Sequence, residues 1–317
     1  MIATTYPVGV ALVLVVLPVV EPRAGPLALA AVLAMHLALT GLALVPLALR
    51  RDARPLRIAL MALAVISIVR FGGEWLSLPR AEPANLGVLS WNLELGSRAG
   101  KAAVEGLRGV EVDVVALQEL SLDHAAAIEA DPDLRRRFPY RELAPGAGVE
   151  GMGLLSAHPI LRRELATDPL AIEAVLDLGG REVTVITGHP FPGRVGMAGP
   201  LPVAFDPSSR DSALLRFRAR VDAAIGRGET VIIVGDFNTA PTEPAFGPLT
   251  TGLADAHAEV GFGPGWTWRP SRLEGLGLGV LRIDLALSGP GAVPVGVAER
   301  CSLPGDHCQL TARFALD

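Results

Sequence analysis

Hydrophobic residues are distributed unevenly along the chain. In the first 80 residues they form three runs, Tyr6–Val20, Pro26–Leu49 and Ile58–Val69. A transmembrane helix needs about 20 predominantly apolar residues, so only the second run, which has 24 residues and no Asp, Glu, Lys or Arg, is long enough to span by itself. The first and third runs have 15 and 12 residues, and each could be a spanning or an interfacial helix. We expect residues 1–80 to be a membrane region with about three transmembrane helices.

Two further interpretations concern these shorter runs. The third run reaches Leu78 only if its helix continues through Arg70. The first run could be a cleaved signal peptide, but it has no preceding Lys or Arg and no small-x-small cleavage site before Glu21, features that signal peptides normally carry. We therefore retain the first run as a helix of the mature chain.

Basic residues indicate the orientation of the membrane region. Arg50, Arg51, Arg54 and Arg57 are crowded between the second and third runs, whereas the loop after the first run holds only Arg23. Loops rich in Lys and Arg remain in the cytoplasm. If the third run spans, the chain emerges on the outer face, so we expect a multi-pass protein of the cell membrane with an extracytoplasmic second part.

From Ala81 onward, short apolar runs alternate with amphipathic segments and Gly/Pro turns, which indicates an α/β domain over residues 81–317. We expect a tight hairpin turn at Leu178–Arg181, where two glycines occur. The predicted strands are 86–92, 113–118, 153–156, 172–178, 183–187, 230–234, 283–287 and 310–314. The predicted helices are 101–108, 121–137 and 208–227. Sheets flanked by helices suggest a layered sandwich.

Composition and charge narrow the function classes. Half of the residues are hydrophobic and the mean hydropathy is +0.41, which excludes a disordered chain, and two cysteines are too few for a disulfide scaffold. Residues 1–80 carry seven Arg against three acidic residues, a net +4, and the rest carries 21 basic and 30 acidic residues, a net −9. An acidic domain is poorly suited to binding nucleic-acid backbone through broad electrostatic attraction.

Polar side chains interrupt the apolar runs where strands begin or end. Each such residue alone could be a cap or a turn, but six interruptions that together supply Asn, Glu, Asp and His residues indicate a chemical site. They are the WN of Trp91–Asn92, the QE of Gln118–Glu119, the GHP of Gly188–Pro190, the GDFN of Gly235–Asn238, the RID of Arg282–Asp284 and the GDH of Gly305–His307.

In this order the six motifs resemble those of the endonuclease/exonuclease/phosphatase superfamily of metal-dependent phosphoester hydrolases. The resemblance extends from Trp91 to His307, nearly the whole of the second part. It implies a four-layered α/β sandwich, in which two packed mixed sheets are flanked by helices, with the site at one edge of the paired sheets.

The resemblance also implies a metal site. Glu119 resembles the principal Mg²⁺ carboxylate of the family, and Asn92 resembles its neighbour at the metal and phosphate. Glu94 stands where some members have a second acidic residue, and Asp306 completes the set by the same resemblance. Such oxygen ligands suit Mg²⁺ or Mn²⁺.

Five further residues take catalytic roles by resemblance. His307 resembles the catalytic histidine, and Asp284 the carboxylate that fixes its tautomer and favours its charged form. Asp236 would orient or deprotonate the attacking water, and Asn238 would donate to a phosphoryl oxygen. His189 resembles a second histidine that protonates the leaving oxygen or stabilises the transition state.

These roles match what phosphoester hydrolysis requires, namely a metal that spreads charge, a placed water and an acid for the leaving group. The chain departs from the family pattern at Leu285, where an aromatic residue is common, and at Cys308–Gln309, where Arg-Pro is more usual. Neither departure affects a catalytic group, so they concern the subfamily to which the chain would be assigned more than its activity.

Three features stay open on sequence alone. Trp266 and Trp268 could pack in the core or contact lipid or substrate. The apolar segment Pro192–Phe205, which follows His189, could be a surface loop, although we expect it to lean on the membrane or receive a lipid tail. Cys301 and Cys308 could be buried thiols or, outside the cytoplasm, a disulfide.

The leading function is therefore a membrane-anchored, outward-facing, Mg²⁺-dependent phosphoester hydrolase. The multi-span leader resembles that of VanJ-like teicoplanin-resistance proteins, which implies a phosphorylated or pyrophosphorylated envelope lipid as substrate and the lipid bilayer as partner. A tethered extracellular nuclease is the second choice, and a phospholipid or sphingomyelin phosphodiesterase the third. A non-enzymatic binding domain would lack some of the catalytic residues, and none is missing.

Overall fold

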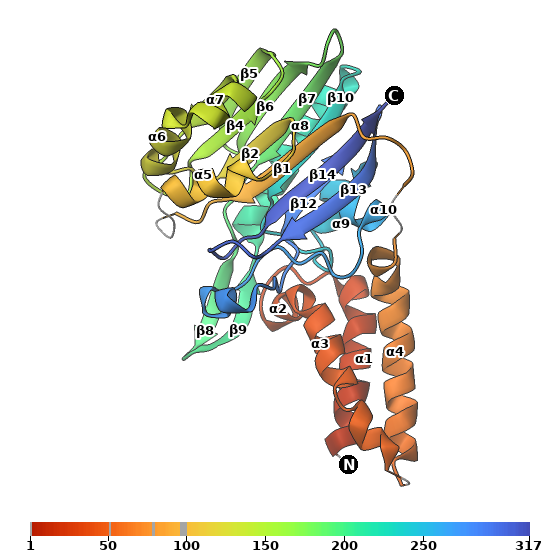
Figure 1. The fold of residues 1–317 in the computed structure, drawn as a ribbon. Helices are drawn as coiled ribbons and strands as arrows, with labels where there is room; N and C mark the ends of the chain where they lie inside the picture. Colours follow the sequence, from red (N-terminus) through yellow and green to blue (C-terminus); the bar gives the residue numbers. More distant parts are fainter. Residues whose placement is uncertain (1, 51, 78–79, 96–99) are drawn as a thin grey trace.

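The computed structural model describes residues 2–50, 52–77, 80–95 and 100–317. A bundle of N-terminal helices lies at one end of a layered α/β sandwich (Figure 1). The helices of the bundle are α1 (Ile2–Val20), α2 (Pro26–Val32), α3 (Ala34–Leu42), the 3-10 helix η1 (Val45–Leu49) and α4 (Arg54–Trp75).

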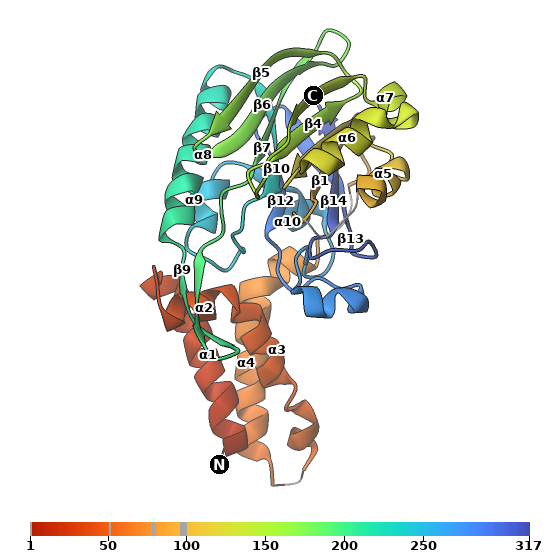
Figure 2. The ribbon, with the colours of Figure 1, turned by 90° about the vertical axis from the view of Figure 1, so that its left-hand side faces the viewer.

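Helices α1 and α4 are long and apolar enough to cross a bilayer, and α2 with α3 and η1 adds a third crossing if this bent pair counts as one span. At 1.5 Å per residue, α1 and α4 are about 28 and 33 Å long, close to the thickness of a hydrocarbon core of about 30 Å. The loop that carries Arg50 and precedes Arg54 lies at the end of the bundle opposite the sandwich (Figures 1 and 2). Arg51 and Leu78 lie outside the described residues.

The second apolar run is not the single straight helix that its length predicted. It bends by 73° between α2 and α3. Helix α3 ends at Leu42, four residues before Pro46, because a proline ring clashes with the carbonyl of the fourth residue before it in a continuing helix. The bend at Leu33 has no such local signal. It accompanies a backbone bridge between Gly25 and Phe205, which ties the start of α2 to the sandwich.

Conversely, the third run forms the longest helix of the bundle, because Arg70 is accommodated inside it. Pro18 of α1 has no N–H, so the carbonyl of Leu14, four residues earlier, lacks its usual helical donor. The Arg70 guanidinium donates to this carbonyl at 2.9 Å. A hydrogen bond between α1 and α4 therefore replaces the one that proline removes.

The sandwich contains two six-stranded mixed sheets. The first sheet has the order β13-β14-β1-β2-β4-β3, in which β1 and β2 are parallel and the other neighbours are antiparallel. Its strands are β1 (Leu86–Asn92), β2 (Val114–Gln118), β3 (Tyr140–Ala144), β4 (Met152–Ser156), β13 (Ala292–Arg300) and β14 (Gln309–Leu316).

The second sheet has the order β11-β12-β10-β7-β6-β5, and its one parallel pair is β7 with β10. Its strands are β5 (Ile160–Thr167), β6 (Leu170–Asp177), β7 (Glu182–Gly188), β10 (Thr230–Asp236), β11 (Ala254–Asp255) and β12 (Asp284–Ser288). Strands β8 (Arg194–Ala198) and β9 (Leu201–Asp206) form a separate hairpin.

Helices cover the outer face of each sheet and complete four layers (Figures 1 and 2). The central core contains residues such as Val88 and Ile232, one from each sheet, and two outer cores lie beneath the helices. The helices are α5 (Gly100–Arg108), α6 (Leu122–Ala130), α7 (Pro132–Arg137), α8 (Ser208–Gly226), α9 (Phe246–Thr250), α10 (Ala256–Val260) and the 3-10 helix η2 (Ser271–Leu276). The predicted four-layered α/β sandwich is confirmed.

The predicted elements differ from the structure in informative ways. The helix expected over residues 121–137 is two helices, because the Asp131 side chain accepts hydrogen bonds from the backbone of Asp133 and Leu134, and Pro132 opens a new helix. The turn at Leu178–Arg181 joins β6 to β7 as expected, with both glycines at positive φ. The strands that the pattern missed are β3, β5, β8, β9, β11 and β13.

The parallel pair β7 and β10 approaches closely at two glycines. Gly235 lies opposite Gly188 in the register, and a Cβ added to Gly235 would lie 2.1 Å from the Gly188 carbonyl oxygen. Since that oxygen belongs to the backbone of a buried strand, neither strand can move without disturbing the core.

We expect Gly235→Ala to lower the free energy of unfolding by about 3 kcal/mol, the upper part of the usual cost of overpacking. Thermal unfolding followed by circular dichroism measures it. Gly226→Ala is the control, because its added Cβ meets nothing within 4 Å and alanine in a helix is favoured by roughly 0.5–1 kcal/mol. Equal stabilities of the two variants would contradict the steric argument.

Candidate active site

The two parallel strand pairs deliver polar side chains to one edge of the sandwich. Asn92 ends β1 and Glu119 directly follows the neighbouring β2, whereas Asp236 ends β10 and His189 directly follows β7. Because parallel strands end at the same edge of a sheet, each pair brings two of these side chains together. A hydrogen bond from Asn92 Nδ2 to Asp236 Oδ2, at 3.0 Å, joins the two sheets at this edge.

Further polar residues lie at or just before the first residue of an antiparallel strand. Asp284 opens β12 and lies opposite Asp236 in the register. Asp306 and His307 immediately precede β14, which runs antiparallel to β1. All nine residues predicted from the sequence therefore lie at one edge, the remaining two being Glu94 and Asn238.

Asp236 is at the centre of the cluster and is buried. Its Oδ2 lies 3.6 Å from His189 Nε2 and 3.5 Å from His307 Nε2, and its Oδ1 accepts the backbone N–H of Asn238 at 2.9 Å. Burial raises the pKa of the Asp236 carboxyl, while the two neighbouring imidazoles oppose this shift. The nearby positive charge of an imidazolium is what allows this carboxylate to stay ionised away from water.

His307 lies between two carboxylates. Its Nδ1 is 2.9 Å from Asp284 Oδ2 and its Nε2 faces Asp236. Burial would lower the pKa of His307, but the charges of Asp284 and Asp236 outweigh burial and raise it to about 10. The ring is therefore a cation at neutral pH, with Nδ1–H directed to Asp284 and Nε2–H facing the cluster. Thr267 Oγ1 accepts the Asp284 backbone N–H at 3.1 Å and so fixes the start of β12.

His189 has a defined orientation as well. Its Nδ1 lies 3.1 Å from the Val149 carbonyl oxygen, and a carbonyl only accepts, so Nδ1 carries a hydrogen. Nε2 then points to Asp236 and, at 3.8 Å, to Glu119 Oε1. This nitrogen faces the interior of the cluster, where a leaving group could receive a proton.

Three carboxylates gather on the other side of Asn92. Glu94 Oε2 accepts the Asp306 backbone N–H at 3.0 Å, and Glu119 Oε1 accepts from Asn92 Nδ2 at 3.1 Å. Asp306 Oδ1 is buried and has no hydrogen-bond partner among the described residues. Burial is the main cause that raises the pKa of Asp306 to about 6, and the charges of Glu94 and Glu119 add to it against the opposing charge of His307.

This carboxylate cluster fits a divalent cation. The buried Oδ1 of Asp306, which has no hydrogen-bond donor among the described residues and lies beside two more carboxylates, offers an oxygen to a cation. Its oxygen donors are the kind that Mg²⁺ and Mn²⁺ prefer. Asp236, Asp284 and His307 also place ligand atoms within 4.8 Å of one another, but an imidazolium has no lone pair to offer a metal.

Strained backbone marks the same residues. Glu94, Glu119 and Asn238 have φ values of 53°, 53° and 51°, a left-handed conformation that residues with a Cβ seldom adopt. Each follows shortly after a strand end, so the chain turns sharply and directs a polar side chain back to the edge. Strain of this kind persists where the surrounding structure enforces it and is concentrated at functional sites.

Arg210 supports the site and was not identified from the sequence. It is fully buried, pairs with Glu243 at 2.8 Å and Asp211 at 2.6 Å, and donates to the Asn238 carbonyl at 2.7 Å. The pattern held a signal for it: residues 210, 214, 217, 221 and 224 form the buried stripe of α8, so Arg210 occupies an apolar position. Arg216, Arg218 and Arg220 of the same helix form ion pairs with Asp168, Asp222 and Glu164 instead.

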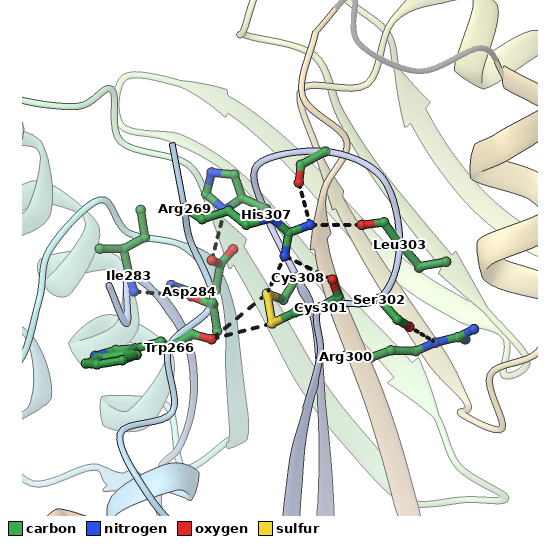
Figure 3. The surroundings of a disulfide bond; sticks show 12 residues. Trp266, Arg269, Ile283, Asp284, Arg300, Cys301, Ser302, Leu303, His307 and Cys308 are labelled. Atoms are coloured by element: carbon green, nitrogen blue, oxygen red, sulfur yellow. Dashed lines mark hydrogen bonds and ion pairs between the residues drawn. A yellow bond between two sulfur atoms is a disulfide. The ribbon is translucent and has the colours of Figure 1, made fainter. Parts of the chain in front are cut away.

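Arg269 and a disulfide hold the loop that precedes Asp306 (Figure 3). Cys301 and Cys308 are bonded to each other, which decides the alternative left open by the sequence. Arg269 is completely buried and donates to the carbonyl oxygens of Cys301, Leu303 and Gly305 at 3.0, 2.9 and 2.7 Å. The Asp306 backbone is therefore fixed from both sides of the loop.

The two tryptophans have separate positions. Trp268 Nε1 donates to Asp306 Oδ2 at 3.2 Å, so this residue belongs to the site. Trp266 stacks on His36 of α3, with ring centroids 5.1 Å apart. One member of the pair thus orients a candidate metal ligand, and the other packs against the helical bundle.

Arg282 joins the catalytic edge to α4. It is buried, pairs with Asp255 at 2.7 Å, and reaches Glu74 in the last turn of α4 at 3.3 Å. Two residues later the chain reaches Asp284, the partner of His307. The sequence motif contained Arg282, but the partner that it finds in the membrane region was not predictable from it.

Comparisons with known proteins agree with this geometry. The sequence model of the Endonuclease/Exonuclease/phosphatase family matches residues 89–307. No curated protein sequence gives a significant match. Among solved structures, a humanized D. rerio TDP2 with 14 mutations shares 17% identity at a TM-score of 0.57, with 73% of this chain and 98% of that chain covered.

Two other solved structures are similar over the same 73% of this chain. The 3′ phosphatase NExo from Neisseria, bound to a product DNA hairpin, shares 20% identity over 99% of its own length at a TM-score of 0.56. Sphingomyelinase C from Streptomyces griseocarneus shares 20% identity over 99% of its length at a TM-score of 0.51. At these identities the similarity demonstrates the fold.

We predict that Mg²⁺ stabilises the sandwich in a pH-dependent way. The folded pKa of Asp306, about 6, exceeds the ordinary value of 3.8. Without metal, the protonated carboxyl therefore favours the folded state fully below about pH 4, and this contribution to the free energy of unfolding is lost as pH rises through 6. Saturating Mg²⁺ should raise the unfolding temperature by about 5 °C at pH 7.5 and by less at pH 5.

Tryptophan fluorescence during heating, with chelator or Mg²⁺, measures this difference. Asp306→Asn is the informative variant: it should be more stable than the wild type without metal at pH 7.5 and should respond little to Mg²⁺. A wild-type protein that gains equal stability from Mg²⁺ at both pH values would contradict the carboxylate site.

Proposed function

Because the chain belongs to the Endonuclease/Exonuclease/phosphatase family, whose members are metal-dependent phosphoester hydrolases, we propose that it hydrolyses a phosphorylated or pyrophosphorylated lipid of the cell envelope. The hydrolase domain would comprise residues 81–317, and residues 1–80 would hold it at the outer face of the membrane. One observation carries this proposal, the ion pair between Glu74 of α4 and Arg282. Because Arg282 lies two residues before Asp284, this ion pair holds the proposed catalytic edge next to the end of a helix that is long enough to span a membrane. Such an edge is confined to the plane where lipid head groups lie.

The carboxylate cluster would hold the metal. Asn92, Glu94, Glu119 and Asp306 supply amide and carboxylate oxygens, and we infer Mg²⁺ or Mn²⁺ from this hard donor set. When bound, the ion supplies positive charge that withdraws electron density from the phosphoryl group.

The remaining polar residues would carry out proton transfer and charge stabilisation. Asp236, between two imidazoles, would accept a proton from the attacking water, and His189 Nε2 would donate one to the leaving oxygen. The His307 cation, oriented by Asp284, would stabilise negative charge on the phosphoryl oxygens. One Nδ2 hydrogen of Asn238 is bonded to the Pro190 carbonyl at 3.0 Å, and the second is available for a phosphoryl oxygen.

Charge distribution supports the outward orientation. The loop between η1 and α4 lies at the end of the bundle opposite the sandwich (Figure 1). Arg50, Arg54 and Arg57 lie in or next to this loop in sequence, and loops with several arginines stay in the cytoplasm. With α1, the α3–η1 segment and α4 as three crossings, the sandwich is then on the outer side. A disulfide is also stable in that compartment.

A tethered nuclease is the second candidate, and the likeness to NExo with its DNA hairpin is its support. The net charge of −9 over residues 81–317 weighs against it, since proteins bind the phosphate backbone chiefly through basic residues. A phospholipid or sphingomyelin phosphodiesterase is the third candidate, with sphingomyelinase C as the similar structure. The lipid substrate is the one that the sequence resemblance to VanJ-like proteins implies, and that branch stays part of the proposal.

The substrate is tested with the full chain in lipid nanodiscs with Mg²⁺. We expect release of phosphate from polyprenyl pyrophosphate to be faster than hydrolysis of sphingomyelin, glycerophospholipid or plasmid DNA. His307→Ala, the blank, should lower kcat by about 100-fold or more, since it removes a charge at the reaction centre. Rapid DNA cleavage without lipid turnover would reverse the ranking, and no turnover of any phosphoester would refute the proposal.

The orientation is tested separately with reporter fusions. Alkaline phosphatase fused after Asp317 should be active, because it folds only outside the cytoplasm, and a fluorescent protein at the same position should be dark. Fusions after Arg50, in the basic loop, should give the reverse pattern. An active phosphatase after Arg50 and an inactive one after Asp317 would place the hydrolase in the cytoplasm.

A further inference from the structure

The β8–β9 hairpin is an exposed apolar element that is joined to the helical bundle through Phe205 near its base. Within the described part of the chain it pairs with no third strand. Residues 195–204 contain only Val, Gly, Met, Ala, Pro and Leu. The exposed fractions are 51% for Val195, 56% for Met197, 65% for Leu201 and 44% for Val203. A two-stranded ribbon is marginally stable in water, and so concentrated an apolar surface indicates a binding role.

The base of the hairpin is polar, in contrast to its tip. Arg194 pairs with Asp206 at 2.9 Å, and Asp206 Oδ1 accepts hydrogen bonds from the backbone and side chain of Ser208. The charged side chains of the hairpin therefore lie at its base, and the ten residues between 195 and 204 carry no charge. This division between a charged base and an apolar tip is typical of segments that cross from water into lipid.

The base is attached at the level where the helical bundle meets the sandwich. Gly25, between α1 and α2, exchanges two backbone hydrogen bonds with Phe205, at 2.8 and 3.1 Å. From there the hairpin extends beside α2 toward the bundle, and does not point back to the sandwich (Figures 1 and 2). If α1 and α4 span, the tip lies among the lipids around them.

The hairpin is also continuous with the active site. It begins five residues after His189, and the Phe191 ring, 51% exposed, contacts the His189 ring edge-on, with centroids 6.3 Å apart. Only residues 190–193 separate His189 from the first strand of the hairpin.

We propose that the β8–β9 hairpin is a second membrane contact, inserted into the outer leaflet, which holds the catalytic edge at the level of lipid phosphates. The partner is the lipid surface itself. The inference rests on the membrane anchoring of the proposed function, but it does not require a particular substrate. A hairpin that instead covers a second copy or another protein would leave its tip shielded from lipid.

Fluorescence quenching tests the position directly. Both native cysteines are in the disulfide, so Met197→Cys introduces a single thiol that takes an environment-sensitive fluorophore. In nanodiscs of phosphatidylethanolamine and phosphatidylglycerol, we expect a blue-shifted emission that lipids with nitroxide-labelled acyl chains quench. The control Leu161→Cys, on the outer strand β5 and of similar exposure at 54%, should show neither effect. Equal quenching at both positions, or a shielded but unquenched probe at 197, would overturn the proposal.

An activity measurement gives an independent readout. Met197→Asp/Leu201→Asp should lower turnover of a lipid phosphoester in nanodiscs by about tenfold or more, because carboxylates are costly in lipid, and should leave hydrolysis of a soluble nitrophenyl phosphodiester within about twofold of wild type. Leu161→Asp/Leu165→Asp, on β5, is the matched control. Equal loss on both substrates would overturn the proposal. If no phosphoester is hydrolysed but the probe at 197 is quenched by lipid, the proposed function fails and the membrane contact stands.

Discussion

The catalytic edge depends on one buried carboxylate, Asp236, at the place where the two sheets meet. A charge in this position is costly unless it is paired and hydrogen-bonded, and Asn92, His189 and His307 supply those contacts from the other strands. Each of these side chains must then arrive from a strand end at a fixed angle. The positive φ of Asn238, which presents its own N–H to Asp236, is a consequence of the same requirement.

The electrostatics of the edge divide it into two halves around Asn92. On the side of Asp236, carboxylates alternate with imidazoles, so negative charge is balanced and the His307 pKa rises to about 10. On the side of Asp306, three carboxylates lie together, and burial with the charges of Glu94 and Glu119 raises the Asp306 pKa to about 6 against the opposing charge of His307. In the proposed function the first half would supply the proton donors and acceptors, and the carboxylate oxygens of the second half would hold a divalent ion.

Buried and half-buried arginines serve a common purpose outside the site, since each donates hydrogen bonds to carbonyl or carboxylate oxygens of other segments. Arg70 replaces the helical donor that Pro18 lacks, and Arg269 satisfies the carbonyls of the loop before Asp306. Arg282 links α4 to the strand that carries Asp284. The guanidinium suits these positions because it stays charged and offers several donors in a fixed plane. The orientation of the helices and the geometry of the catalytic edge are thus joined by side chains that contact no substrate.

The sequence by itself determined the elements whose signals are local. The apolar run that ends in Asn92 predicted the bounds of β1 correctly. The polar residues at or next to strand ends gave nine candidate residues that the structure brings to one edge, because a polar break in a buried strand is visible without knowing the neighbours. The tertiary structure alone decided where strands find partners and where buried charges are paired. Edge strands such as β5 expose most of their side chains and lack a hydrophobic pattern. The bend at Leu33 accompanies a bridge between Gly25 and Phe205, and the buried Arg210 is paired with Glu243. These features depend on residues distant in sequence, whose proximity exists only once the sheets have packed.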